Sequence, residues 1–149
     1  MSTATLFILM ALVAGISVPT QAGINAQLGL WTKSPVLAAT ISFAVGTLTL
    51  IAYTLVARIP LPALAGIGGH PWWIWIGGAL GAFFVTATII LVPKLGATTM
   101  VTTVLAGQMV ASLLLDHFGA LGYPLHPVSL GRIVGVLLVC VGVWLIKVF

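Results

Sequence analysis

Charged residues are nearly absent from this sequence, and glutamate is absent altogether. Only 4% of the 149 residues are Asp, Glu, Lys or Arg, whereas 61% are hydrophobic. A soluble domain carries about 25% charged residues, so a monomer this poor in charge could not stay dissolved. The composition excludes an ordinary soluble domain and predicts a chain whose surface faces lipid.

The scarcity of reactive side chains excludes further classes of function. Asp116 is the only carboxylate side chain and Cys140 the only thiol. The sequence contains no paired acids, metal-ligand cluster or nucleotide-binding glycine loop, so we expect no enzyme activity, no metal and no cofactor. The five basic residues are scattered, so the net charge of +4 does not indicate a nucleic-acid partner.

Five apolar stretches are long enough to cross a bilayer, which takes about 20 residues of helix. The predicted helices cover residues 3–31, 35–57, 71–92, 97–117 and 129–147. Ser34 and Ser129 are suitable N-caps, and Gly119 is a suitable C-cap. A tight turn is predicted over residues 93–96. The breakers of the loop after the second helix are Pro60, Pro62, Gly66, Gly68 and Gly69. The sequence predicts an all-α integral membrane protein with a single transmembrane domain, residues 1–149.

The first helix allows two interpretations, because polar residues occur in its second half but no charge appears before Lys33. The helix either ends near Gly23 or continues to Trp31 with a kink at Pro19. We favour the longer helix, because the Ser-Pro pair after Lys33 is the first strong turn signal. In the longer helix Gln21 would lie near the membrane midplane, next to the kink.

The basic residues are divided almost evenly between the two sides of the membrane. Five spans place Arg58 and Arg132 on one side and Lys33, Lys94 and Lys147 on the other. An excess of Lys and Arg in cytoplasmic loops sets orientation, and two against three is a weak instruction. Either the chain inserts both ways and pairs as an antiparallel homodimer, or it has one topology with the three lysines inside. We favour the first interpretation, because such a dimer is an inverted repeat made from one gene.

Polar side chains within the spans are expected to face other helices or a wet cavity, because an unpaired polar group in hydrocarbon costs several kcal/mol. The predicted substrate-binding residues are Ser17, Gln21, Asn25, Thr88 and Gln108. The members of this set on the first helix, Ser17, Gln21 and Asn25, could equally hold that helix to its neighbours. Two further stripes are expected to form contact faces: Ser42, Gly46, Thr49 and Tyr53 on the second helix, and Gly131, Gly135 and Gly142 on the last. Asp116 lies near the end of its helix and is expected to pair with His117 or Arg132.

Three segments resemble the YdcZ-like branch of the drug/metabolite transporter superfamily. They are GISVPTQAGINAQL at residues 15–28, AGQMVASLLLDHFG at residues 106–119 and SLGRIVGVLLVCVGVWLI at residues 129–146. The resemblance implies a five-helix unit that pairs with an inverted second copy into ten helices, in a bacterial inner membrane. Relatives in the superfamily export small metabolites or toxic cations. The small multidrug resistance branch uses a glutamate in the middle of the membrane, where this chain has Gln21 and Asn25, so a neutral or zwitterionic solute is favoured.

The sequence therefore predicts a transport protein that moves a small polar solute by alternating access. The expected form is an antiparallel homodimer of dual topology, with the lipid bilayer and an unidentified small molecule as its other partners. Two alternatives stay open. Threonine and amide side chains could line a passive channel, and stripes of small residues alone would suit a membrane scaffold without transport activity.

Overall fold

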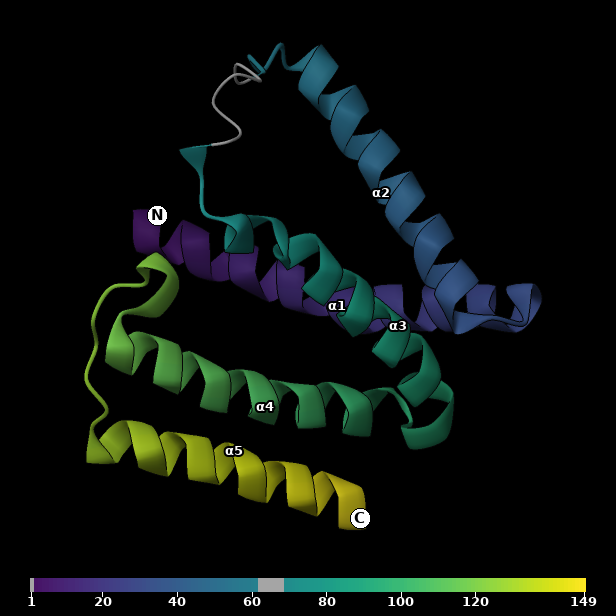
Figure 1. Cartoon of the computed structure of the whole chain (residues 1–149). Coiled ribbons are helices and arrows are strands. Elements are labelled where there is room, and N and C mark those ends of the chain that lie inside the picture. The colour runs from purple at the N-terminus through teal and green to yellow at the C-terminus, as the bar shows by residue number, and fades with distance from the viewer. Residues whose placement is uncertain (1, 62–68) are drawn as a thin grey trace. The chain divides into compact units, whose positions relative to one another are not determined.

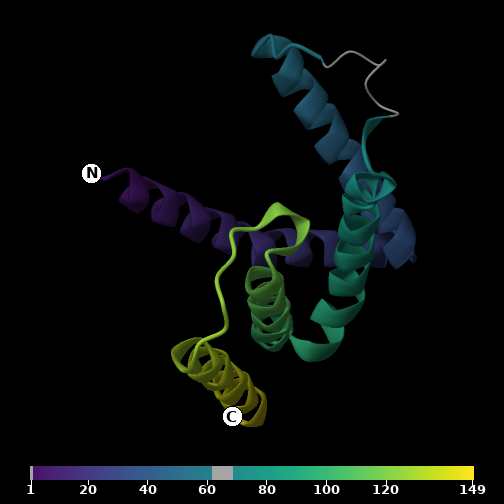
Figure 2. The same cartoon turned by 60° about the vertical axis from the view of Figure 1, so that its left-hand side comes forward.

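The chain folds into helices joined by short connections, as the computed structural model in Figures 1 and 2 shows. The structure describes residues 2–61 and 69–149, and within them it contains no strand. Its α-helices are α1 (Thr3–Thr32), α2 (Pro35–Val56), α3 (Gly77–Leu95), α4 (Ala97–Phe118) and α5 (Leu130–Val148). Short 3-10 helices are η2 (Trp72–Trp75), before α3, and η3 (Ala120–Gly122), after α4. Pro62, Gly66 and Gly68 of the predicted loop lie outside the described residues.

Among the described residues, five helical segments are long and apolar enough to cross a membrane, with η2 and α3 together forming the third. This confirms the predicted all-α class with five spans. The longer interpretation of the first helix is also confirmed, because α1 continues through Pro19 to Thr32. At about 1.5 Å per residue, α1 is about 45 Å long and exceeds the bilayer core of about 30 Å. The kink expected at Pro19 stays a prediction.

The turn predicted over residues 93–96 is wrong for its first three residues. Pro93 and Lys94 lie inside α3, which ends at Leu95. Proline has a φ close to the helical value and is tolerated near a helix end, whereas Gly96 has a φ of 78° and changes the chain direction by itself. At the other end of this span, Pro71 precedes the 3-10 turn η2, and α3 begins only at Gly77.

The predicted helix caps are confirmed by their hydrogen bonds. Ser34 Oγ accepts from Leu37 N at 3.3 Å, and Ser129 Oγ accepts from Arg132 N at 3.4 Å. Gly119 ends α4 in the left-handed conformation. Each cap satisfies backbone groups that a helix end leaves unpaired. The capping residues therefore fix where α2 and α5 begin and where α4 ends.

The chain divides into two compact units, with one boundary inside α1 and the other at the end of α3. One unit, the α1–α3 unit, comprises Thr20–Lys94; the other, the α4–α5 unit, comprises Met1–Pro19 and Leu95–Phe149. Each unit is described by itself below.

Small residues form the centre of the α1–α3 unit. Ala38 and Ala39 of α2 are buried together with Val85 and Ile89 of α3, and Leu28 of α1 packs against this cluster. The closest approach is at Gly29, where an added Cβ would lie 2.7 Å from Cγ2 of Ile89. We call Gly29, Ala38 and Ile89 the packed layer. Small side chains let membrane helices approach closely, and this layer holds α1, α2 and α3 together next to the α1–α2 turn.

Helices α4 and α5 of the other unit lie side by side and antiparallel (Figures 1 and 2). Hydrogen bonds fasten the connection between them at several points. The amide of His126 donates to the Asp116 carbonyl at 2.8 Å, and the amide of Val128 donates to Nδ1 of His117 at 3.2 Å. The connection therefore has a defined path from the end of α4 to the start of α5.

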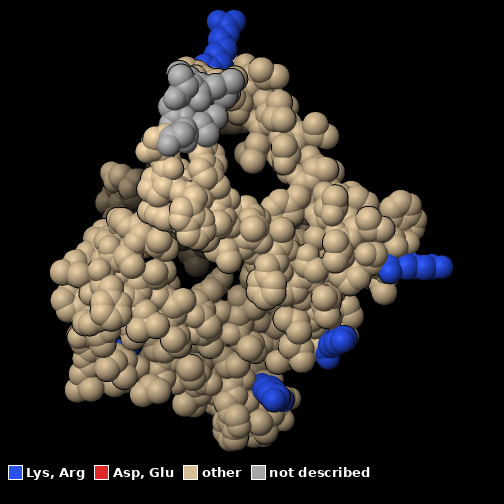
Figure 3. All heavy atoms as spheres, viewed as in Figure 1, with Lys and Arg blue, Asp and Glu red and all other residues tan. Residues whose placement is uncertain are grey.

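Most large apolar side chains lie on the outside of the described chain, and few are buried. Figure 3 shows few charged side chains on the face in view, and broad areas of it carry none. Water would oppose this distribution, because burial of apolar area drives folding in water. The surface therefore fits a chain surrounded by lipid tails or by further membrane helices.

The packed layer predicts that Gly29→Ala destabilises the protein by about 1–3 kcal/mol, because the methyl group would collide with a branched side chain that cannot rotate away. Gly23→Ala on the same helix is the matched control, since its Cβ would meet nothing within 4 Å, and it should be neutral or stabilising. The free energy of unfolding in mixed detergent micelles would measure both.

A double-mutant cycle tests the cause. Ile89→Ala removes Cγ2, so Gly29→Ala should cost less in that background than in the wild type. If Gly29→Ala and Gly23→Ala have the same stability, the close approach at residue 29 is not a constraint on the fold.

Candidate functional site

The α1–α3 unit contains a pocket. The packed layer lies between this pocket and the α1–α2 turn. Away from the α1–α2 turn, α2 diverges from α1 and α3 (Figures 1 and 2). The pocket has a volume of about 210 Å³ and is lined by Gln21, Ser42, Phe43, Gly46, Thr47, Leu50 and Val85. All three helices of the unit contribute, and none of the lining residues is charged.

The apolar wall of this pocket is held in place by a glycine on α3. An added Cβ at Gly81 would lie 3.3 Å from Cζ of Phe43, so the Phe43 ring lies against the α3 backbone there. With Leu50 and Val85, this ring gives the pocket an apolar side. The polar side is formed by the amide of Gln21 and the hydroxyls of Ser42 and Thr47.

The hydroxyls of the pocket differ from most others in the helices. Thr40, Thr49, Thr54 and Thr86 each donate to the carbonyl four residues earlier, at 2.8–2.9 Å, which is the usual way in which a helical threonine is satisfied. The hydroxyls of Ser42 and Thr47 make no hydrogen bond to the described part of the chain. Their hydroxyls are therefore available to a solute or to water in the pocket.

A buried amide lies one turn along α1 from Gln21. Asn25 is only 4% exposed, and within the described chain its Nδ2 atom is buried without a hydrogen-bond partner. A buried donor without a partner costs about 1–3 kcal/mol. Thr88, one turn along α3 from Val85, is equally buried at 3% but satisfied, because its hydroxyl donates to the Val85 carbonyl at 2.8 Å. Of these two buried polar side chains, only Asn25 has an unsatisfied donor, which helix packing alone does not explain.

The predicted substrate residues divide between the two units. Gln21, Asn25 and Thr88 belong to the α1–α3 unit, whereas Ser17 and Gln108 belong to the α4–α5 unit. Ser17 is exposed, and its hydroxyl donates to the Val13 carbonyl at 3.0 Å. Gln108 is exposed on α4. Their roles stay predictions.

Of the residues that line this pocket, sequence reasoning assigned only Gln21 to a binding site. Ser42 and Gly46 were assigned to a contact face on α2, but both line the pocket. Thr47 was not singled out, because it lies off that stripe. The stripe itself was a usable signal, since a polar residue and a glycine four apart on a membrane helix can border a cavity as well as a packing surface.

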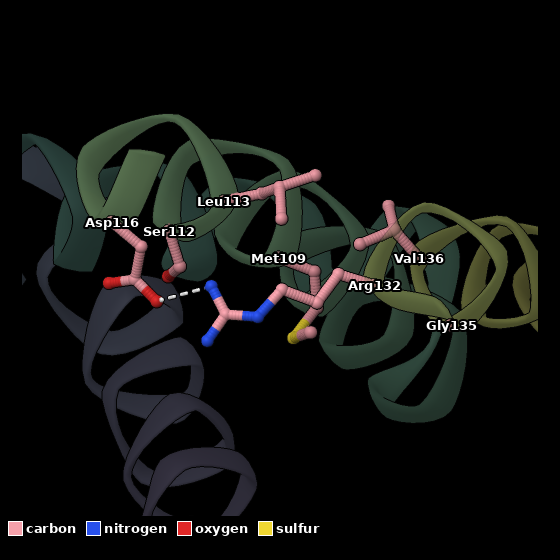
Figure 4. A pocket seen from close by; sticks show the side chains of 7 residues that line it. All are labelled: Met109, Ser112, Leu113, Asp116, Arg132, Gly135 and Val136. Atoms are coloured by element: carbon pink, nitrogen blue, oxygen red, sulfur yellow. Dashed lines mark hydrogen bonds and ion pairs between the residues drawn. The ribbon is translucent and has the colours of Figure 1, made fainter. Parts of the chain in front are cut away.

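A second pocket lies within the α4–α5 unit (Figure 4). Its volume is about 280 Å³, and it is lined by Met109, Ser112, Leu113, Asp116, Arg132, Gly135 and Val136. Nη1 of Arg132 donates to Oδ2 of Asp116 at 3.3 Å and to the His126 carbonyl at 3.1 Å. The partner expected for Asp116 is therefore Arg132. Within the described residues, no group of His, Cys, Asp and Glu could hold a metal ion.

The unpartnered amide predicts that Asn25→Leu raises the stability of the purified protein by about 1–3 kcal/mol, because leucine has a similar volume and leaves no donor unsatisfied. If the Asn25 amide instead stabilised the fold through a hydrogen bond, Asn25→Leu would lower the stability. Thr88→Val is the control, because its hydroxyl is already satisfied by its own helix, and its effect should be small. Thermal denaturation in detergent would compare the variants, and a lower melting temperature for Asn25→Leu would show that the amide has a structural partner.

Comparison with known proteins adds to this geometry. A family model described as "Putative inner membrane exporter, YdcZ" matches residues 6–145. The chain is 41% identical over 75 residues to "Inner membrane protein YdcZ" of Escherichia coli (strain K12). This alignment covers 50% of each protein, so the chain spans about half the length of the curated relative that it matches. No solved structure matches the chain.

Proposed function

Because the chain belongs to the YdcZ-like branch of the drug/metabolite transporter superfamily, we propose that it exports a small polar solute through the pocket of the α1–α3 unit. It is a multi-pass protein of the inner membrane. The observation that carries the proposal is the pairing of a pocket that has unbonded hydroxyls with a buried amide, Asn25, that lacks a partner. Folding leaves such groups unsatisfied at a cost, and a transported solute can satisfy them.

The lining favours a solute that is uncharged or zwitterionic. Gln21, Ser42 and Thr47 offer both donors and acceptors of hydrogen bonds, and the pocket contains no carboxylate. The only acid of the whole sequence, Asp116, is engaged with Arg132 between α4 and α5. A cation in the pocket would lose its hydration without gaining a counter-charge, which is costly in a membrane.

The proposal includes a second copy of the chain, inserted in the opposite orientation. The almost even division of Lys and Arg between the two sides of the membrane supports this second copy, because neither orientation of the chain is strongly favoured. The outward apolar surface supports it as well, because one five-helix chain buries few of its large side chains. Two inverted copies would be related by a two-fold axis and would each contribute an equivalent pocket. Many secondary transporters use such an inverted repeat to expose their substrate site to each side of the membrane in turn.

Export is tested by the solutes that cells release. We expect over-expression of the wild type to enrich at least one small polar solute in the medium, as detected by untargeted mass spectrometry. Gln21→Ala and Asn25→Leu should each reduce its export about tenfold, the effect of losing one hydrogen bond to a substrate. Thr49→Val is the control, because its hydroxyl is bonded within α2, outside the pocket. Export that is independent of Gln21 and Asn25 would exclude this pocket as the route.

Orientation is tested by labelling single cysteines in a Cys140→Ser background. Leu61→Cys follows α2 and Phe149→Cys ends the chain, both at exposed positions, and five spans place them on opposite sides of the membrane. Dual topology predicts that an impermeant thiol reagent labels about half of the molecules at each site in intact cells. Full labelling at one site and none at the other would establish a single orientation and contradict the antiparallel homodimer.

A further inference from the structure

The pocket between α4 and α5 reaches the end of this helix pair at which the two spans would leave the membrane. Asp116 is the third residue from the end of α4 and Arg132 is the third residue of α5, so both belong to the same end of the helix pair. Met109 lies two helical turns from Asp116 toward the middle of α4, which is about 10 Å at 1.5 Å per residue. The pocket is therefore charged at its rim and apolar at depth.

The ion pair at the rim leaves part of each charged group without a partner. Arg132 uses only Nη1 for Asp116 and for the His126 carbonyl, and in the described chain its Nε and Nη2 atoms make no hydrogen bond. In Figure 4 this edge of the guanidinium faces away from Asp116. The second carboxylate oxygen of Asp116 and the hydroxyl of Ser112 likewise have no hydrogen bond to the described residues.

These free groups fit a ligand that carries both signs of charge. The Nε–Nη2 edge of arginine is the fork that binds phosphate oxygens in pairs, and the free oxygen of Asp116 accepts from an ammonium group. The helix ends reinforce this polarity, because the N-terminal end of α5 favours an anion and the C-terminal end of α4 favours a cation. The ion pair need not break, since each partner offers atoms that it does not use.

We propose that this pocket binds a phospholipid whose headgroup carries a phosphate and a primary ammonium, as in phosphatidylethanolamine. The phosphate lies against Arg132, the ammonium against Asp116, and the first part of an acyl chain against Met109, Leu113 and Val136. Gly135 leaves the space for this chain, because a Cβ there would meet nothing within 4 Å. The bound lipid bridges α4 and α5 next to the connection between them.

The test uses delipidated full-length protein in dodecyl maltoside, with bound lipid counted by native mass spectrometry. Dioleoyl phosphatidylethanolamine should bind about tenfold more tightly than dioleoyl phosphatidylcholine, whose quaternary ammonium has no hydrogen to donate, or than phosphatidylglycerol, which has no ammonium. Asp116→Asn should remove this preference. Arg132→Lys should weaken the binding of all three lipids, because lysine lacks the paired N–H donors of the guanidinium group. Equal affinity of the wild type for all three lipids would overturn the proposal.

Two glycine variants test the groove without touching the charges. Gly135→Leu fills the pocket and should abolish lipid binding, whereas Gly131→Leu, one turn earlier on α5 and equally open, lies outside the pocket and should retain it. The pair keeps the test decisive if the charge variants fold poorly. Equal lipid binding by Gly135→Leu and Gly131→Leu would refute the groove. Binding of glycerophosphoethanolamine, which lacks acyl chains, as tight as that of the lipid would refute a lipid in favour of a water-soluble ligand.

Discussion

Hydrogen bonds that close within a single helix are the constraint on which the rest of this structure depends. A bilayer offers no water to a backbone amide or to a side-chain hydroxyl, so both must find partners in the chain. Thr40, Thr49, Thr54 and Thr86 do so by donating to their own helix. Against this background Ser42, Thr47 and Asn25 stand apart, because all three lack a side-chain hydrogen bond to the described residues and border or adjoin one cavity.

Contact between the helices follows from small side chains rather than large ones. Alanines and one glycine bring α1, α2 and α3 together in a layer that has no space for a further methyl group at Gly29. Where that layer ends, α2 diverges, and the pocket opens in the space that results. Close packing at one level of the unit thus creates the cavity at the next, and a change in the packed layer would alter the pocket even though no residue of that layer lines it.

The single acid of the chain has a structural partner, and this shapes both proposals. Asp116 is 29% exposed and Arg132 37% exposed, so the ion pair is neither fully hydrated nor isolated in hydrocarbon. Exposed pairs contribute little to stability, but this pair also joins the end of α4 to the start of α5. Because the acid is held there, the pocket of the α1–α3 unit has only neutral groups to offer a solute, while the pocket of the α4–α5 unit has one charge of each sign.

The sequence by itself determined the features that depend on near neighbours along the chain. Composition and run length established five apolar helices, and Ser34, Ser129 and Gly119 marked helix ends, because capping involves only residues a few positions apart. Local reasoning failed at Pro93, where a proline was tolerated in the last turn of a helix and glycine alone made the turn. It also assigned Ser42 and Gly46 to packing, because spacing shows which residues share a face but not what that face meets.

Only the tertiary structure decided which helix faces meet one another and which polar groups remain without partners. The unpartnered amide of Asn25, the pocket that includes Thr47 and the choice of Arg132 over His117 for Asp116 all depend on distances between helices. Those distances are set by which small residues allow two backbones to approach, and a one-dimensional pattern does not contain them.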